Sequence, residues 1–437
     1  MSVPLPARVE ERLANGATVV VARRDGVPLA AVRLLVRAGS ALDPPRRHGL
    51  AHLVATSARR GTRRRSGRRL DEEVESLGAE LGAGADEDAA WFGLSAPAES
   101  LGRLLDLAVE VATEPSFPAA EVDRLRRREV AALQHDLDEP SAVADRAMLG
   151  AAYGDHPYGH PVEGRVRHLA AARRPDVVGF HRRWYGPSAA TLVVVGSVDP
   201  ERALRQVRRR LGGWRGAGDP PPELPVPATA PRSVLVVDKP DATQTQVRIA
   251  VPALPRRSPH YFPAVVASGI LGGGFTSRLM EAIRVNRGLS YGVRSRFAMS
   301  RSGGLFLVST FTKNETAGEI VSVALDEVER FCDGGPTAEE MQRIQAYLAG
   351  LFPLSLETNE QVAEKLCDMA LYGLSAEEIA EYPERVRAVT AAEVVEVARR
   401  TFPRERGVVV AVGPAARIAG QLERFGPLRV VPARQTL

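Results

Sequence analysis

Two histidines four residues apart stand in a stretch of the sequence that could bind a metal. The segment HGLAHLVATSARRGT begins at His48, places His52 among small apolar residues, and has the composition of a helix. Histidines at positions i and i+4 share one helix face and can chelate zinc there. A catalytic site also needs a third ligand and a base for the attacking water, but Ala51 stands beside His52 and the segment has no carboxylate. The alternative is that His48 is a solvated residue at a helix start.

Other residues of reactive types lack the spacing that a site requires. His156 and His160 stand around a proline and a glycine, which favours a role in shaping a turn. Cys332 and Cys367 have no motif spacing and are expected to be two buried thiols. The glycines of LGGGFTSRL (271–279) are not followed by the Gly-Lys-Ser/Thr of a phosphate-binding loop. Nucleotide binding is therefore not expected.

The basic run RRGTRRRSGRR (59–69) and the net charge of +5 raise the question of nucleic-acid binding. The chain holds 58 Lys and Arg against 53 Asp and Glu, so the two signs almost balance. Lysine occurs only at positions 239, 313 and 365, which means that arginine fills nearly every basic position, as a coding bias produces. No aromatic residue stands among the arginines of the run to stack on bases. We therefore expect no nucleic-acid partner.

Composition and hydropathy are those of an ordinary globular protein. Hydrophobic residues make up 44% of the chain and charged residues 25%. No apolar run is long enough to span a bilayer. The opening MSVPLPARVEERLANG lacks the basic start and apolar stretch of a signal peptide. We expect a cytoplasmic protein with no membrane partner.

A proline-rich segment divides the 437 residues almost evenly. Residues 216–232 are expected to form an extended linker between an N-terminal domain, 1–215, and a C-terminal domain, 233–437. Each half repeats a β-rich opening, helical segments, a strand and a long amphipathic helix, and SRLMEAIRVN (277–286) is one of the helical segments. We therefore predict an α+β fold of two homologous domains, each a largely antiparallel sheet flanked by helices.

Five motifs, in order, resemble those of the insulinase and pitrilysin family of zinc peptidases, in its bacterial and mitochondrial-processing-peptidase-like branch. The motifs are GLAHLVATSARRGT, LGAELGAGADEDAAWF, HPYGHPVEG, FHRRWYGPSAATLVVVGSVD and ILGGGFTSRLMEAIRVNRGLSYGV. Each motif is weak alone, but the ordered set covers nearly the whole chain and is specific. The resemblance implies a processing-peptidase-like fold for both domains.

The resemblance also shows a degenerate zinc motif. The family's H-x-x-E-H aligns so that His52 keeps the first ligand, Ala55 replaces the glutamate base and Thr56 replaces the second histidine. The spacing to a downstream Asp-Glu-Pro places the family's glutamate ligand at Ala132, and Glu129 stands three residues upstream in a different register. Alanine offers no ligand atom and a neutral hydroxyl is a poor one. We expect no metal and no cofactor in this chain.

A second constellation of the family is intact. Arg284 precedes Tyr291 by seven residues, the spacing at which the family places an arginine and a tyrosine that reach the zinc-bearing half. A guanidinium can hold substrate carbonyl groups, and a phenol can donate to the oxyanion of a tetrahedral intermediate. The alternative is a surface ion pair for Arg284 and a core position for Tyr291. Gly272, Gly273 and Gly274 are expected to give backbone freedom beside a peptide channel.

The zinc half-site is lost, whereas the half-site of Arg284 and Tyr291 is retained. This combination indicates a non-catalytic subunit. We expect Arg284 and Tyr291 to act in trans at the zinc site of a paralogous peptidase subunit, with unfolded peptides as substrates and no activity from this chain alone. A catalytically inert structural or peptide-binding homologue, which could be a homodimer, is the alternative from another class. An autonomous metalloenzyme that uses His48 and His52 is the least favoured interpretation.

Overall fold

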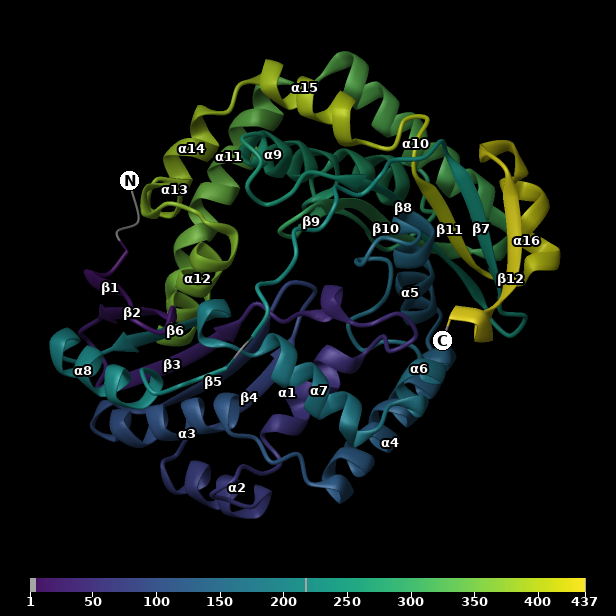
Figure 1. Ribbon diagram of the computed structural model, residues 1–437. Coiled ribbons are helices and arrows are strands. Elements are labelled where there is room, and N and C mark those ends of the chain that lie inside the picture. Colours follow the sequence, from purple (N-terminus) through teal and green to yellow (C-terminus); the bar gives the residue numbers. More distant parts are fainter. Residues whose placement is uncertain (1–4, 217, 437) are drawn as a thin grey trace.

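The computed structural model describes residues 5–216 and 218–436, and each half of the chain forms one six-stranded sheet (Figure 1). The first sheet has the order β1 (Arg8–Arg12), β2 (Thr18–Arg23), β6 (Ala190–Gly196), β3 (Leu29–Val36), β5 (Ala90–Pro97), β4 (Gly82–Ala85). The second has the order β12 (Leu428–Pro432), β7 (Ser233–Asp238), β11 (Val408–Gly413), β8 (Gln244–Ala253), β10 (Gly304–Lys313), β9 (Val293–Met299).

The two sheets repeat one connectivity. The series β2-β6-β3-β5-β4 in the first sheet corresponds to β7-β11-β8-β10-β9 in the second. In both, the first pair of the series is parallel and the remaining pairs are antiparallel. The predicted α+β fold of two homologous, largely antiparallel sheets flanked by helices is confirmed.

In the described part of the chain, eight α-helices from each half surround the two sheets, and most of them cover the outer face of the sheet of their own half. Those of the first half are α1 (Leu50–Ala58), α2 (Gly67–Ser76), α3 (Leu101–Thr113), α4 (Ala119–His135), α5 (Pro140–Tyr153), α6 (Val166–Ala171), α7 (Arg174–Trp184) and α8 (Pro200–Leu211). Those of the second half are α9 (Tyr261–Gly272), α10 (Ala317–Gly334), α11 (Ala338–Leu351), α12 (Asn359–Tyr372), α13 (Ala376–Ala380), α14 (Tyr382–Ala388), α15 (Ala391–Thr401) and α16 (Ala415–Leu422). Each half has its own core on that face.

Strand sequences show which faces are covered. In β5 every second residue is buried, because one face packs on the core helices and the other is only partly covered. In β6 every residue is buried. Leu192 and Val194 face the core of their own half, and Val193 and Val195 face a cluster that includes α12. A continuous apolar strand therefore marks a position that is covered on both faces.

One helix of each half packs on the sheet of the other half. α5, from the first half, packs on β8 and β11 of the second sheet. α12, from the second half, packs on β3 and β6 of the first sheet (Figure 1). The Arg248 guanidinium on β8 also donates to the Asp145 carboxylate on α5 at 2.6 Å. The buried apolar contacts of α5 and α12, together with this ion pair, hold the two halves together.

Two segments singled out in the sequence are the proline-rich segment and the helix expected over 277–286. Residues 218–230, within the proline-rich segment, form no helix or strand. The helix expected over 277–286 contains a π-helical turn, η5 (Met280–Val285), which carries Arg284. Such wider turns occur often at functional positions. Among the described residues, no helix has the length and apolar character needed to cross a membrane.

Candidate functional site

The helix that carries His52 is fixed at its N-terminus. α1 follows Gly49, which has a φ of 97°. The Asp43 carboxylate accepts hydrogen bonds from the backbone N–H groups of Gly49 at 2.6 Å and Ala51 at 2.7 Å. This carboxylate pairs with N–H groups that the helix leaves free. A Cβ at Gly49 would lie 2.5 Å from the Glu163 carbonyl oxygen, so glycine is required for the fit as well as for the backbone angle.

The altered motif positions behave as ordinary helix residues. Ala55 is fully buried in the core of the first half. The Thr56 hydroxyl donates to the carbonyl oxygen of His52 at 2.8 Å and is therefore turned toward its own helix. Ala132 is exposed on α4. Neither alanine has a ligand atom, and the threonine hydroxyl is already engaged.

Glu129 lies opposite His52, and the expectation that it stands out of register is wrong. Its carboxylate Oε2 is 3.9 Å from Nε2 of His52, and its other oxygen accepts a hydrogen bond from Arg128 at 2.7 Å. Residues three apart on a helix occupy neighbouring positions on one face, so α4 can present Glu129 where the aligned spacing placed Ala132. The packing of α4 beside α1, rather than the sequence count, sets which residue is presented.

The residues present do not fit a catalytic zinc ion. Such an ion requires three protein ligands and an open position for water. His52 and Glu129 supply two, and the part of the chain that the structure describes has no group of three or more His, Cys, Asp or Glu side chains that could hold a metal.

His48 belongs to a cluster of three histidines, which neither sequence interpretation foresaw. It precedes α1, so it does not share a helix face with His52, and it is not a freely solvated residue. Its ring stacks on His160 with centroids 3.9 Å apart and meets His168 edge-on at 4.6 Å. His160, expected only to shape a turn, is buried in this cluster. The Nδ1 atoms of His48 and His168 are buried without hydrogen-bond partners.

The cluster should make the fold sensitive to acid. Burial, with the neighbouring histidines and Arg165, lowers the pKa of His48 to about 3, and burial with nearby arginines lowers the pKa of His168 to about 4. Burial also lowers the pKa of His160. The unfolded chain, with histidine pKa values near 6.5, takes up more protons below that pH. Stability is therefore present above pH 6.5 and is lost as the pH falls through 6 to 4.

We expect the three histidines to lower the urea midpoint as the pH falls from 7 to 5. Each fully buried neutral histidine contributes up to about 1.4 kcal/mol per pH unit, and the partial exposure of His48 reduces its share. His48→Phe should make the urea midpoint less dependent on pH, because phenylalanine keeps a stacking ring but has no titratable group. His135→Phe, at an exposed histidine of α4, is the matched control and should leave the slope unchanged. Equal slopes in all three proteins would contradict this account.

Arg284 and Tyr291 are both exposed. The Tyr291 side chain is 84% exposed, so the alternative that places it in the core is wrong. Within the described chain, neither its hydroxyl nor the Arg284 guanidinium has a hydrogen-bond or ion-pair partner. The guanidinium lies over the ring of Phe275, 5.6 Å from the centroid, and that ring is itself 78% exposed. Sequence reasoning missed Phe275, which follows the three glycines directly.

Gly272 and Gly273 are required for packing rather than for backbone freedom. None of the three glycines has a positive φ. A Cβ at Gly272 would lie 2.5 Å from the backbone nitrogen of Ser295, and one at Gly273 would lie 2.7 Å from the Cα of Gly269. A Cβ at Gly274 would meet nothing within 4 Å. The expectation of conformational freedom is therefore wrong for the first two: Gly272 lets α9 approach β9 closely, and Gly273 fits against Gly269 of α9 itself.

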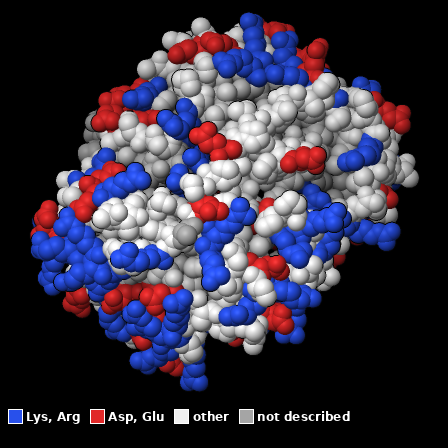
Figure 2. Space-filling model, in the orientation of Figure 1, with Lys and Arg blue, Asp and Glu red and all other residues white. Residues whose placement is uncertain are grey.

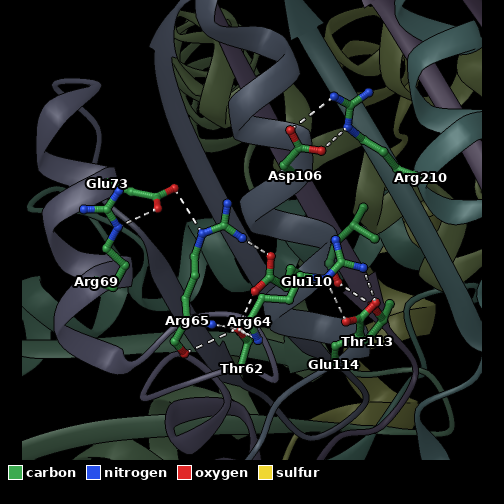
Figure 3. A network of polar contacts seen from close by, with 11 residues as sticks. Thr62, Arg64, Arg65, Arg69, Glu73, Asp106, Glu110, Thr113, Glu114 and Arg210 are labelled. Atoms are coloured by element: carbon green, nitrogen blue, oxygen red, sulfur yellow. Dashed lines mark hydrogen bonds and ion pairs between the residues drawn. The ribbon is translucent and has the colours of Figure 1, made fainter.

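The basic run 59–69 is largely neutralised within the fold (Figure 3). Arg65 bonds to Glu73 on α2 and to Glu110 on α3, and Glu110, only 5% exposed, also accepts from the Thr62 hydroxyl. Further pairs of this region are Arg64–Glu114, Arg68–Glu72, Arg69–Glu73 and Arg210–Asp106. In Figure 2, acidic side chains stand among the basic ones at the lower left, where α2, α3 and α8 lie. The run therefore joins α2 to α3.

Arg65→Met should destabilise the fold by roughly 3 kcal/mol, because it leaves the buried Glu110 carboxylate without its cation. Arg68→Met removes a pair with Glu72 at the surface and should cost less than about 0.5 kcal/mol. Urea unfolding of the two variants beside the unchanged chain measures the difference. Similar losses in both variants would show that the Arg65 pair is no stronger than a surface contact.

These features define a two-domain α+β protein of the zinc-peptidase type with an incomplete metal site. Residues 18–165 match the family profile described as insulinase (peptidase family M16), and residues 172–348 match the one described as peptidase M16 inactive domain. An uncharacterized zinc protease of Mycobacterium tuberculosis is 28% identical over 409 residues, with 92% of each chain covered. One of Streptomyces coelicolor is 24% identical over 407 residues, 92% of this chain and 88% of that protein.

Solved structures show the same relationship. The crystal structure of a peptidase M16 inactive domain from Pseudomonas fluorescens superposes with a TM-score of 0.88 and 25% identity, over 93% of this chain and 98% of that one. A protease from Helicobacter pylori has the same fold, with a TM-score of 0.87 at 19% identity and coverage of 94% and 100%. The chain belongs to the insulinase family, peptidase family M16.

Proposed function

We propose that this chain is the zinc-free subunit of a heterodimeric metallopeptidase, and that it supplies Arg284 and Tyr291 to the zinc site of a paralogous partner. One observation carries the proposal: among the described residues, both side chains are exposed and without polar partners, and only His52 and Glu129 stand at the chain's own metal position. Polar groups that the fold does not use internally are available to a second molecule.

The two side chains suit different stages of peptide cleavage. The Arg284 guanidinium presents N–H donors to a carbonyl oxygen of the bound peptide. The Tyr291 hydroxyl donates to the oxyanion that develops on the attacked carbonyl. The partner would supply zinc, which activates the attacking water. The proposed substrates are unfolded peptides, and the proposed compartment is the cytoplasm.

The test is reconstitution with a family M16 chain from the same source that carries an intact H-x-x-E-H. Hydrolysis of a quenched, unstructured fluorescent peptide is measured for each chain alone and for the mixture, and gel filtration reports assembly. We expect no hydrolysis from this chain, and a mixture that exceeds the partner alone. If the chains copurify but activity does not rise, the proposal fails and the chain is an inert peptide-binding homologue.

A further inference from the structure

A small cavity lies between the end of α9 and α11, and one of its lining residues, Phe275, is next to the Arg284 guanidinium. The cavity has a volume of about 260 Å³. Its apolar wall consists of Ile270 on α9, Phe275 after the glycines, and Ile344 and Tyr347 on α11. We call this cavity the Phe275 pocket.

The charged residues around the Phe275 pocket are occupied with one another. The Glu340 carboxylate accepts two hydrogen bonds from the Arg278 guanidinium, at 2.6 and 2.8 Å. The same guanidinium donates to the Gly335 carbonyl oxygen at 2.7 Å. Arg343 bonds to Glu339 and to the Thr276 carbonyl oxygen, each at 3.4 Å. The pocket therefore presents mainly apolar surface to a ligand.

Two aromatic rings at the pocket remain in solvent. Phe275 is 78% exposed and Tyr347 is 52% exposed, although each could bury a large apolar area against a partner. Phe275 also contacts the Arg284 guanidinium, 5.6 Å from its ring centroid. One residue that lines the pocket, Phe275, is thus next to the arginine that, in the proposed function, holds the peptide backbone.

We propose that the Phe275 pocket takes one bulky apolar side chain, of the Phe, Leu or Met type, from the peptide whose backbone Arg284 holds. This inference rests on the proposed function and names its substrate preference. The volume favours a single side chain, because small-molecule and cofactor sites occupy about 300–1,000 Å³. A charged side chain would lose its hydration there without gaining a free counter-ion.

The test measures binding to the isolated chain, without a partner and without turnover. Three labelled peptides share one flexible sequence and differ at one position, which is Phe, Ala or Asp, and fluorescence anisotropy gives their dissociation constants. Burial of a Phe side chain should favour the Phe peptide about 10- to 100-fold over the Ala peptide. The Asp peptide should bind more weakly still.

Substitutions at the Phe275 pocket test whether the preference for the Phe peptide arises there. Phe275→Ala and Tyr347→Ala should each reduce the preference for Phe, and both change exposed residues, so the fold should survive. Leu354→Ala, at an exposed apolar residue of the same half that does not line the cavity, is the matched control and should retain the full preference. Unfolding midpoints confirm that all three variants fold.

The outcomes separate this inference from the proposed function. Equal affinity for the Phe and Ala peptides, or no binding up to about 1 mM peptide, overturns the pocket whatever the mixed complex does. A preference that persists in both alanine variants also overturns it. A preference that is lost in both, together with a mixed complex that shows no activity, supports the pocket and rejects the proposed function.

Discussion

Tyr291→Phe should slow turnover of the mixed complex on the order of 10²- to 10³-fold, the usual cost of removing one oxyanion donor. The side chain is 84% exposed and its hydroxyl has no partner within the described residues, so the change removes no contact that the fold uses. Assembly and unfolding midpoint should therefore be unchanged. The measurement is kcat for hydrolysis of a saturating peptide by the mixed complex, with gel filtration as the check on assembly.

Arg284→Ala should behave differently, because a held carbonyl is engaged before the transition state forms. We expect a higher KM as well as a lower kcat for Arg284→Ala, against a change confined to kcat for Tyr291→Phe. Tyr153→Phe removes a phenol hydroxyl from another element, α5, and serves as the control. If Arg284→Ala and Tyr291→Phe both support full turnover, the pair has no part in catalysis.

Much of the fold could be predicted because it follows from local pattern. The alternation in β5 and the continuous apolar run of β6 predict strands, and repetition of the same order of elements predicts two similar domains. The exchange of α5 and α12 between the sheets could not be predicted. The sequence of an amphipathic helix shows that one face is buried, but it does not show which sheet covers that face.

The site was predicted where residue identity decides the chemistry and missed where packing decides it. The absence of ligand atoms at Ala55 and Ala132 is visible in the sequence. The approach of Glu129 to His52 depends on how α4 lies beside α1, and a shift of one helical turn changes which residue is presented. The contact of His48 with His168 joins segments more than a hundred residues apart, with no spacing signal between them.

The position of Glu129 changes what the loss of the zinc motif means. With His52 and Glu129 already 3.9 Å apart, Thr56→His adds a second imidazole at i+4 on the same face of α1. Two histidines and a glutamate are the ligand set of a known class of zinc sites. We therefore expect Thr56→His to hold about one zinc ion per chain, where the unchanged chain holds no stoichiometric zinc. The gain should exceed the 10- to 100-fold effect typical of an outer-shell partner.

Two further variants decide which residue is the third ligand. Glu129→Ala in the Thr56→His background should abolish zinc binding, whereas Ala132→Glu should not be needed for it. If zinc bound only after Ala132→Glu, the third ligand would belong at position 132, as the alignment placed it, and Glu129 would not reach the metal. Metal analysis after dialysis and a competition titration with a chelator measure both. No hydrolysis should accompany the zinc in Thr56→His alone, because Ala55 still offers no base for the bound water.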